Sequence, residues 1–266
     1  MILVIIFGYI LLQVPHRQVA QFGINNTTDK AKLENDYRAT LTQIIGGFVI
    51  LFGLFFTWRN LVTIKEGQIT ERFTKAVDQL GATDQTGQPA IEIRLGGIYA
   101  LGRIAKESKE DYWPIMEILT AYIRKNSSID NQRDRKEEII SLDIQAILTI
   151  IGENKYSYKK RDLHRLNLER TNLKGATLGW ANLEKVHFKE ANLKEAYFFE
   201  AILKEAHLEK TDLEGANLKG ANLKGAKNLT VDQLSKAKTL YKAKLDPELE
   251  KPLREKCPAL FEKPDE

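Results

Sequence analysis

The segment that decides the fold is TDLEGANLKGANLKG, residues 211–225, which reads as three consecutive five-residue units. A helix repeats its faces about every 3.6 residues and a strand about every 2, so a Leu at every fifth position fits neither element. The same frame runs without a slip from Arg161 to Gly225, which is thirteen pentads. The central residue of every pentad is Leu or Phe, and the residue two places earlier is Ala in eight of the thirteen.

This pattern predicts a coil. Apolar residues two positions apart lie on one side of a strand, so each pentad begins as a strand whose alternate residues point inward. Four glycines of the repeat then fall where the chain must turn, because Gly adopts left-handed backbone angles at little cost. They are Gly175, Gly215, Gly220 and Gly225. Successive turns wind the chain into coils that stack about 4.8 Å apart, joined by backbone hydrogen bonds. The frequent Ala predicts a narrow interior.

The pattern resembles the pentapeptide-repeat family, whose signature is A-[N/D]-L-x-x. Consistent with that signature, the residue between Ala and Leu is Asn or Asp in eight of the thirteen pentads. The resemblance implies a right-handed quadrilateral β-helix in which four pentads make one turn. Residues 161–225 then form about three and a quarter coils, about 16 Å tall.

Helices are expected at both ends of this β-helix. Thr230 and Gln233 have the spacing of a capping box, which predicts a helix directly after Thr230. A further helix is expected to begin at Pro247. Residues 226–266 are therefore assigned to C-terminal capping helices and a tail, and the helix near 138–152 is expected to cover the other end. Uncovered coil ends would invite edge-to-edge pairing.

The N-terminal residues 1–58 predict a transmembrane hairpin. Residues 39–58, ATLTQIIGGFVILFGLFFTW, contain no charge. Twenty helical residues span about 30 Å, the thickness of the hydrocarbon core. A buried core helix is the alternative, but the segment is apolar on every side. The apolar stretch 2–14 predicts either a short first span or the remnant of a longer one, with residues 15–38 as the connecting loop of the hairpin. Equal numbers of positive charges flank the second span on its two sides, so the positive-inside rule does not predict an orientation. The C-terminal part is placed in the cytoplasm because the sequence shows no export feature.

Residues 59–160 show helical periodicity and are assigned to an α-helical collar. The segment IEIRLGGIYALGRIA, residues 91–105, resembles the second helix of a HEAT-type repeat, so a small solenoid-like interaction module is the alternative. A packed collar is preferred because fewer than three repeats seldom make a solenoid. The paired glycines in this segment are interpreted as close helix packing. A membrane span followed by helices and pentapeptide repeats also resembles an arrangement of cyanobacterial and other bacterial family members.

The charge pattern and the motifs exclude several function classes. The chain has 40 Lys and Arg against 36 Asp and Glu, and the segments 1–58, 59–160, 161–225 and 226–266 each carry +1. Nucleic-acid binding is therefore not expected. Cys257, the single cysteine, forms no internal disulfide or cysteine metal cluster. No phosphate-binding loop, nucleophile elbow or zinc-ligand spacing is present. We expect no enzyme activity, no cofactor and no metal.

His187 and His207 lie twenty residues apart, so they should stack on one outward face of the coil. Asn167 completes that column where a metal site would need a third ligand, so an outward ladder is expected. The alternative that the protein is an enzyme would need a catalytic turnover that substitution of His187 or His207 abolishes.

A candidate partner-binding patch consists of Trp180, Tyr197, Phe199 and Ile202. The first three should lie on one side of the coil, one coil apart, with Ile202 on the adjoining side. Large exposed apolar groups often mark contact sites. The alternative is that the protein's own helices cover them.

The predicted protein is thus an α+β membrane-anchored chain: transmembrane helices, an α-helical middle region, a right-handed quadrilateral β-helix and C-terminal capping helices. The predicted function is a non-catalytic scaffold that binds an unidentified protein at a bacterial inner or thylakoid membrane. The alternative is a DNA mimic that binds a topoisomerase, as some pentapeptide-repeat proteins do. A repeat that carries +1 and is about three coils tall favours the scaffold.

Overall fold

The computed structural model describes residues 2–132, 139–153 and 166–264. It divides into two units, Met1–Ile69 and Thr70–Glu266, which are described separately. The first predicted pentad, residues 161–165, lies outside the described residues.

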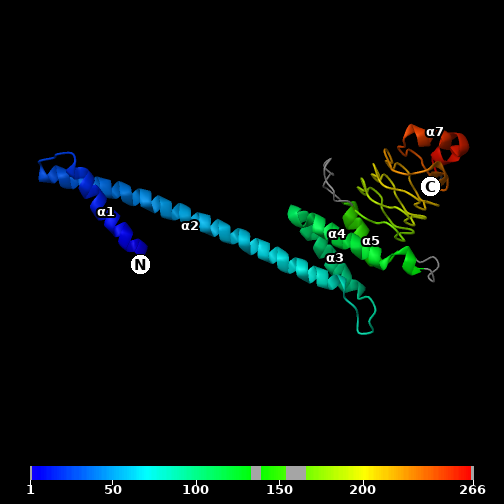
Figure 1. The fold of residues 1–266 in the computed structure, drawn as a ribbon, viewed down its shortest axis with the longest axis horizontal. Helices are drawn as coiled ribbons and strands as arrows, with labels where there is room; N and C mark the ends of the chain where they lie inside the picture. The colour runs from blue at the N-terminus through cyan, green and yellow to red at the C-terminus, as the bar shows by residue number, and fades with distance from the viewer. Residues whose placement is uncertain (1, 133–138, 154–165, 265–266) are drawn as a thin grey trace. The chain divides into compact units, whose positions relative to one another are not determined.

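The first unit is a helical hairpin. Helix α1 (Ile2–Ala20) is followed by α2 (Thr27–Leu80), whose last turns belong to the second unit (Figure 1). The two helices meet where Val19 is buried and where His16 Nδ1 lies 3.1 Å from Glu34 Oε1. The predicted loop over 15–38 is much shorter than expected, because helix occupies all of it except residues 21–26. Helix α1 continues through Pro15, and the side chain of Asn26 accepts a hydrogen bond from the amide of Thr28 at the start of α2.

The predicted second span lies in the middle of α2. Its large apolar side chains are exposed around the whole helix, with Phe48 at 68% and Trp58 at 63% of their full accessible area. Among the described residues, α2 alone is long and apolar enough to cross a membrane.

The second unit begins with packed helices, as the sequence predicts. The end of α2 is followed by α3 (Ile91–Glu107), α4 (Lys109–Asn126), the short 3-10 helix η1 (Ile129–Gln132) and α5 (Leu142–Gly152). Helices α3, α4 and α5 pack against one another. A Cβ atom added at Gly97 would lie 2.6 Å from the carbonyl oxygen of Ala76 on α2. The interpretation of the paired glycines as a site of close helix packing is therefore confirmed for Gly97.

The repeat forms stacked coils. Single parallel β-bridges join residues twenty apart, for example Asn167 with His187 and His187 with His207. Four pentads per turn are therefore confirmed, although the pairing consists of isolated bridges rather than long strands. Every described central Leu or Phe from Leu168 to Leu223 is at most 2% exposed, and Ala196 and Ala201 beside them are fully buried. These apolar residues form the core of the coil.

The corners of the coil depend on two local devices. The fifth residue of each described pentad has positive φ, with 72° at Gly175 and 55° at Arg170. A residue in this conformation is required at the third position of a type II turn, and the amide of Ala176 closes the turn on the carbonyl of Leu173 at 3.0 Å. Where Asn precedes the central residue, its side chain supports the turn; the Asn172 side chain, for example, accepts from the amide of Lys174 at 3.2 Å.

The helical region covers the first described coil. The amide of Asn172 donates to the carbonyl of Ser127 at 2.6 Å, and the amide of Asn182 donates to the carbonyl of Gly152, the end of α5, at 2.8 Å. The side chain of Gln145 on α5 forms two hydrogen bonds of 2.9 Å with the backbone N–H and C=O of Thr177. The edge groups of this coil thus have partners from α5 and its surroundings, as expected.

The other end of the stack extends beyond the predicted boundary at Gly225. Asn217 pairs with Thr239 and Asn222 pairs with Lys244, twenty-two residues apart, so the ladder continues with two residues inserted. The insertion accommodates α6 (Val231–Ser235), which begins with the predicted capping box of Thr230 and Gln233. Helix α7 (Pro247–Lys256) and the 3-10 helix η2 (Pro258–Phe261) follow at this end of the coil (Figure 1).

Candidate functional site

The predicted patch residues Trp180, Tyr197 and Phe199 converge at one corner of the coil. The Trp180 and Phe199 ring centroids are 5.0 Å apart in an edge-to-face arrangement, and the Tyr197 and Phe199 rings stack at 6.0 Å. Trp180 is 66% exposed and Tyr197 is 36% exposed, while Phe199 is half-buried. Ile202, 39% exposed, lies on the adjoining face, where it pairs with Asn182 of the preceding coil. No helix covers these side chains in the described part of the chain.

The pentad register places these rings. Tyr197 precedes a central Phe and pairs with Thr177 one coil earlier, so its side chain points outward. Trp180 is the fifth residue of its pentad and has a φ of 56°, an uncommon conformation for a bulky side chain. Gly179 makes room for the stack, because a Cβ atom there would lie 3.1 Å from the Tyr197 ring.

A fourth aromatic residue and two lysines extend the patch. The Nζ atom of Lys219 lies 5.5 Å from the ring centroid of Phe199 and 5.9 Å from that of Tyr241, and Lys242 Nζ lies 5.3 Å from the Tyr241 ring. These distances are within the range of cation–π contacts. We call Trp180, Tyr197, Phe199 and Tyr241 the aromatic corner.

Sequence analysis missed Lys219, Tyr241 and Lys242. The twenty-residue period would have placed Lys219 in line with Phe199. It could not have placed Tyr241, because the two inserted residues shift the register after Lys227.

Other faces of the coil carry ladders of paired charges. Lys and Glu alternate between coils, as in Lys189–Glu209 at 3.7 Å and Lys194–Glu214 at 2.5 Å. The hydrogen bond between the last two raises the pKa of Lys194 and lowers the pKa of Glu214. The even charge balance of the repeat is therefore built from local pairs.

The two histidines stack on one face, as the sequence predicts, with ring centroids 4.3 Å apart. His187 Nδ1 lies 3.3 Å from Glu169 Oε1. No group of three or more potential metal ligands occurs in the portion of the chain that the structure describes.

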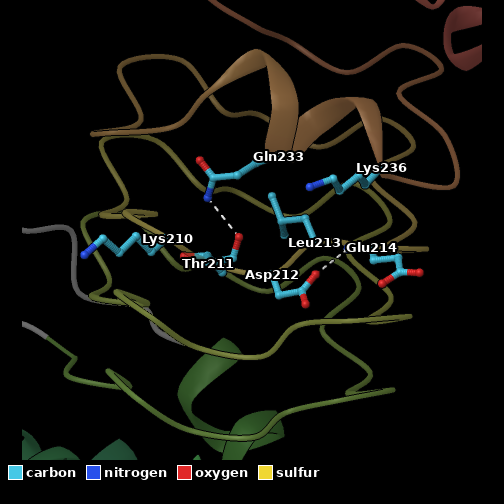
Figure 2. A pocket seen from close by; sticks show the side chains of 7 residues that line it. All are labelled: Lys210, Thr211, Asp212, Leu213, Glu214, Gln233 and Lys236. Carbon is cyan, nitrogen blue, oxygen red and sulfur yellow. Dashed lines mark hydrogen bonds between the residues drawn. The ribbon is translucent and has the colours of Figure 1, made fainter.

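A cavity of about 650 Å³ lies where the chain leaves the coil to form α6. Its walls include Thr211, Asp212 and Leu213 of the coil, with Gln233 and Lys236 from α6 and its end (Figure 2). The Gln233 side chain donates to the carbonyl of Thr211 (Figure 2) and to that of Leu208, both at 2.8 Å, and these bonds fasten α6 to the coil. The charged side chains beside it are paired, since Asp212 contacts Lys194 at 3.5 Å and Lys236 contacts Asp232 at 2.8 Å. The cavity is thus a structural consequence of the inserted helix.

A buried polar cluster holds the helices α3, α4 and α5 together. Arg94 donates to the Tyr122 hydroxyl at 2.9 Å, and that hydroxyl donates to Asp143 at 2.5 Å. Burial, followed by the hydrogen bond to Asp143, raises the pKa of Tyr122 to about 12. The cluster borders a cavity of about 380 Å³. Arg94 and Asp143 also form an ion pair at 3.8 Å, so each of the three side chains contacts the other two. The role of this cluster is therefore to hold the three helices together.

Comparison with known proteins identifies the repeat. The family model described as pentapeptide repeats matches residues 161–189 and 191–227 in eight copies. The comparison with curated proteins gave no match.

Solved structures of three pentapeptide-type proteins resemble part of the chain. A pentapeptide repeat protein from the thylakoid lumen of Arabidopsis thaliana is 24% identical over 34% of this chain and 71% of its own, with a TM-score of 0.24. QnrB1, a plasmid-mediated fluoroquinolone resistance protein, is 22% identical over 34% of this chain and 41% of its own, with a TM-score of 0.28. Rfr23 from the cyanobacterium Cyanothece 51142 is 27% identical over 33% of this chain and 64% of its own, with a TM-score of 0.17. About two thirds of the present chain lies outside each match.

Proposed function

Residues 161–227 belong to the pentapeptide-repeat family, and we propose that the protein is a non-catalytic, membrane-anchored scaffold that binds a protein partner through the aromatic corner. The observation that carries this proposal is the exposure of Trp180 beside Tyr197 and Phe199 on a coil whose other outward positions are mostly polar. Interface hot spots are enriched in clustered aromatic residues, because rigid rings contribute a large contact area at a low cost in conformational entropy.

The membrane anchor is supported by α2. Its central segment exposes rings such as Phe48, Phe52 and Trp58, and none of its most apolar window is buried within the protein. An uncovered apolar surface of this length has a favourable environment in lipid. On this proposal the anchor lies in a bacterial inner or a thylakoid membrane, with the C-terminal unit in the cytoplasm. The orientation is tested by adding protease to sealed right-side-out vesicles, in which a cytoplasmic C-terminal unit is protected. Digestion of this unit would show that it lies on the opposite side of the membrane.

The DNA-mimic alternative has less support from the charges of the coil. A mimic of duplex DNA needs a continuous acidic surface. Here lysines alternate with glutamates, as in Lys185–Glu205 and Lys189–Glu209. Competition between the purified protein and DNA for gyrase would favour the alternative.

The scaffold is tested by quantitative cross-linking of the full-length protein in native membranes. The variant Trp180→Ala/Tyr197→Ala/Phe199→Ala should lose a protein that co-purifies with the wild type. Tyr99→Ala is the matched control, because Tyr99 is an aromatic residue on α3 that is 59% exposed and lies outside the corner. A partner retained by the folded triple variant would remove the aromatic corner as the site.

A further inference from the structure

Several lysines on the two faces that meet at the aromatic corner differ from the paired lysines of the coil, although Lys185 on the face of Ile202 contacts Glu205 at 3.8 Å. On the other faces, Lys174, Lys189 and Lys194 each contact a carboxylate of the next coil. Beside the corner and on the face of Ile202, several lysines have no ion pair with any residue that the structure describes. These are Lys204, Lys219, Lys224, Lys242 and Lys244.

The carboxylates of these two faces on the coil are Glu184, Glu200 and Glu205, of which Glu205 pairs with Lys185. Glu200 is exposed beside Phe199 and lies one coil from Trp180, but it forms no ion pair with another described residue. Lys219 and Lys242 instead lie over the rings of Phe199 and Tyr241. The corner therefore combines aromatic surface with positive charge that the protein itself does not neutralise.

We propose that the aromatic corner binds an acidic protein segment that carries an apolar side chain. This inference rests on the proposed function and specifies the chemistry of the partner. Carboxylates of the segment would meet the ammonium groups of Lys219 and Lys242, and its apolar side chain would pack on Trp180. Complementary charge of this kind raises the association rate and excludes partners of the wrong sign.

The geometry favours a protein segment over a nucleic acid or a lipid surface. Bases stack on open ring faces, but the Phe199 ring is already contacted by Tyr197, Trp180 and Lys219. Insertion into a bilayer uses a broad apolar face, whereas Phe199 is half-buried, Tyr197 is 36% exposed and Trp180 alone is mostly exposed. Hydrogen bonds between coils, such as Phe198 N to Asn217 O at 2.8 Å, hold these groups at fixed spacing.

The test is photo-cross-linking of the full-length protein in native membranes, with p-benzoylphenylalanine in place of Ile202 at the rim of the corner. Mass spectrometry identifies the cross-linked species. The same probe is placed in Lys219→Gln/Lys242→Gln and in the control Lys174→Gln/Lys189→Gln, which removes two paired lysines from other faces. We expect a protein segment rich in Asp and Glu around an apolar residue. Its yield should fall about tenfold in the first variant and with added salt, and should be unchanged in the control.

Other results separate this inference from the function on which it rests. A cross-linked protein segment without excess acidic residues, or a yield that Lys219→Gln/Lys242→Gln does not change, would overturn the acidic partner and leave the scaffold standing. Cross-links only to lipid or nucleic acid, or none above the unirradiated sample, would overturn both.

Discussion

The neighbouring residues Phe198 and Phe199 give the sharpest test of the coil, because they have the same side chain on opposite sides of its wall. Phe198 is a central pentad residue with no exposed surface, and its ring lies 6.4 Å from that of Phe188 in an edge-to-face arrangement. Phe199 is the next residue and points outward, half-buried between Trp180 and Tyr197. We predict that Phe198→Ala destabilises the coil strongly and that Phe199→Ala hardly does.

The magnitude follows from burial. A Phe side chain buries about 150–250 Å², and at about 25 cal/mol per Å² its removal costs about 4–6 kcal/mol. The extended-chain reference makes this an upper value, and measured Phe→Ala costs in cores are about 3–5 kcal/mol. For Phe199 the loss is limited to ring contacts at a partly wet surface, about 1 kcal/mol. The two variants should therefore differ by at least about 2 kcal/mol in the free energy of unfolding.

Hydrogen exchange of the coil amides measures this difference in the full-length protein. The amides of Leu193 and Phe198 donate to carbonyls of the next coil at 2.9 and 2.8 Å, so they exchange only when the coil opens. A loss of 3–5 kcal/mol accelerates this exchange about 150- to 4,000-fold, against about fivefold for Phe199→Ala. Equal acceleration in the two variants would refute the inward and outward assignment of the pentad, and with it the placement of the aromatic corner.

Three further predictions concern the helices of the second unit. Gly97→Ala should lower the thermal midpoint, at a cost of about 1–3 kcal/mol, because the added Cβ atom meets the Ala76 carbonyl at 2.6 Å; Gly96→Ala, whose Cβ atom would have its nearest neighbour at 3.8 Å, is the control and should be nearly neutral. Gln145→Glu should cost about 1–2 kcal/mol and speed exchange of the Thr177 amide, because a carboxylate still accepts from that amide but faces the Thr177 carbonyl without a proton to donate; equal protection in both proteins would exclude this cap. The fold raises the pKa of Tyr122 from 10.0 to about 12, so its stabilising contribution is complete below pH 10 and is lost as the pH rises through 12. Denaturant titrations between pH 10 and pH 12 should show that the free energy of unfolding falls by about 1–2 kcal/mol more for the wild type than for Tyr122→Phe. An equal decrease in the two proteins would contradict this prediction.

Sequence reasoning succeeded where one rule repeats. The inward pair of Ala and Leu, the Asn before the central residue and the glycines at the turns all follow from a pentad whose period is visible in the chain. Four pentads per coil came from the family resemblance, and the bridges between residues twenty apart confirm it. The helices at 91–107 and 109–126 were also predictable, because their apolar residues recur with helical spacing.

The prediction was least accurate where no repeat constrains the chain. The pairing continues to Lys244 because two inserted residues are absorbed around α6, and an insertion interrupts the sequence pattern without interrupting the ladder. Helix α1 continues through Pro15, and the polar residues on both sides of the short loop are helical as well. Neither the proline nor the polar composition of residues 15–38 therefore ended the two helices where the sequence predicts. Tyr241 was missed for the first of these reasons.

The same repeat also limits where recognition can occur on the coil. In most pentads the Ala and Leu positions are used by the core and the Asn position by the turn, so the last two residues vary most freely. Residues at these free positions stack in columns, one coil apart, as Phe199 and Lys219 do. Several columns place Lys against Glu of the next coil, such as Lys194 and Glu214, which neutralise each other. A binding surface can arise where this pairing fails, and the aromatic corner, with its unpaired lysines, is such a place on the described coil.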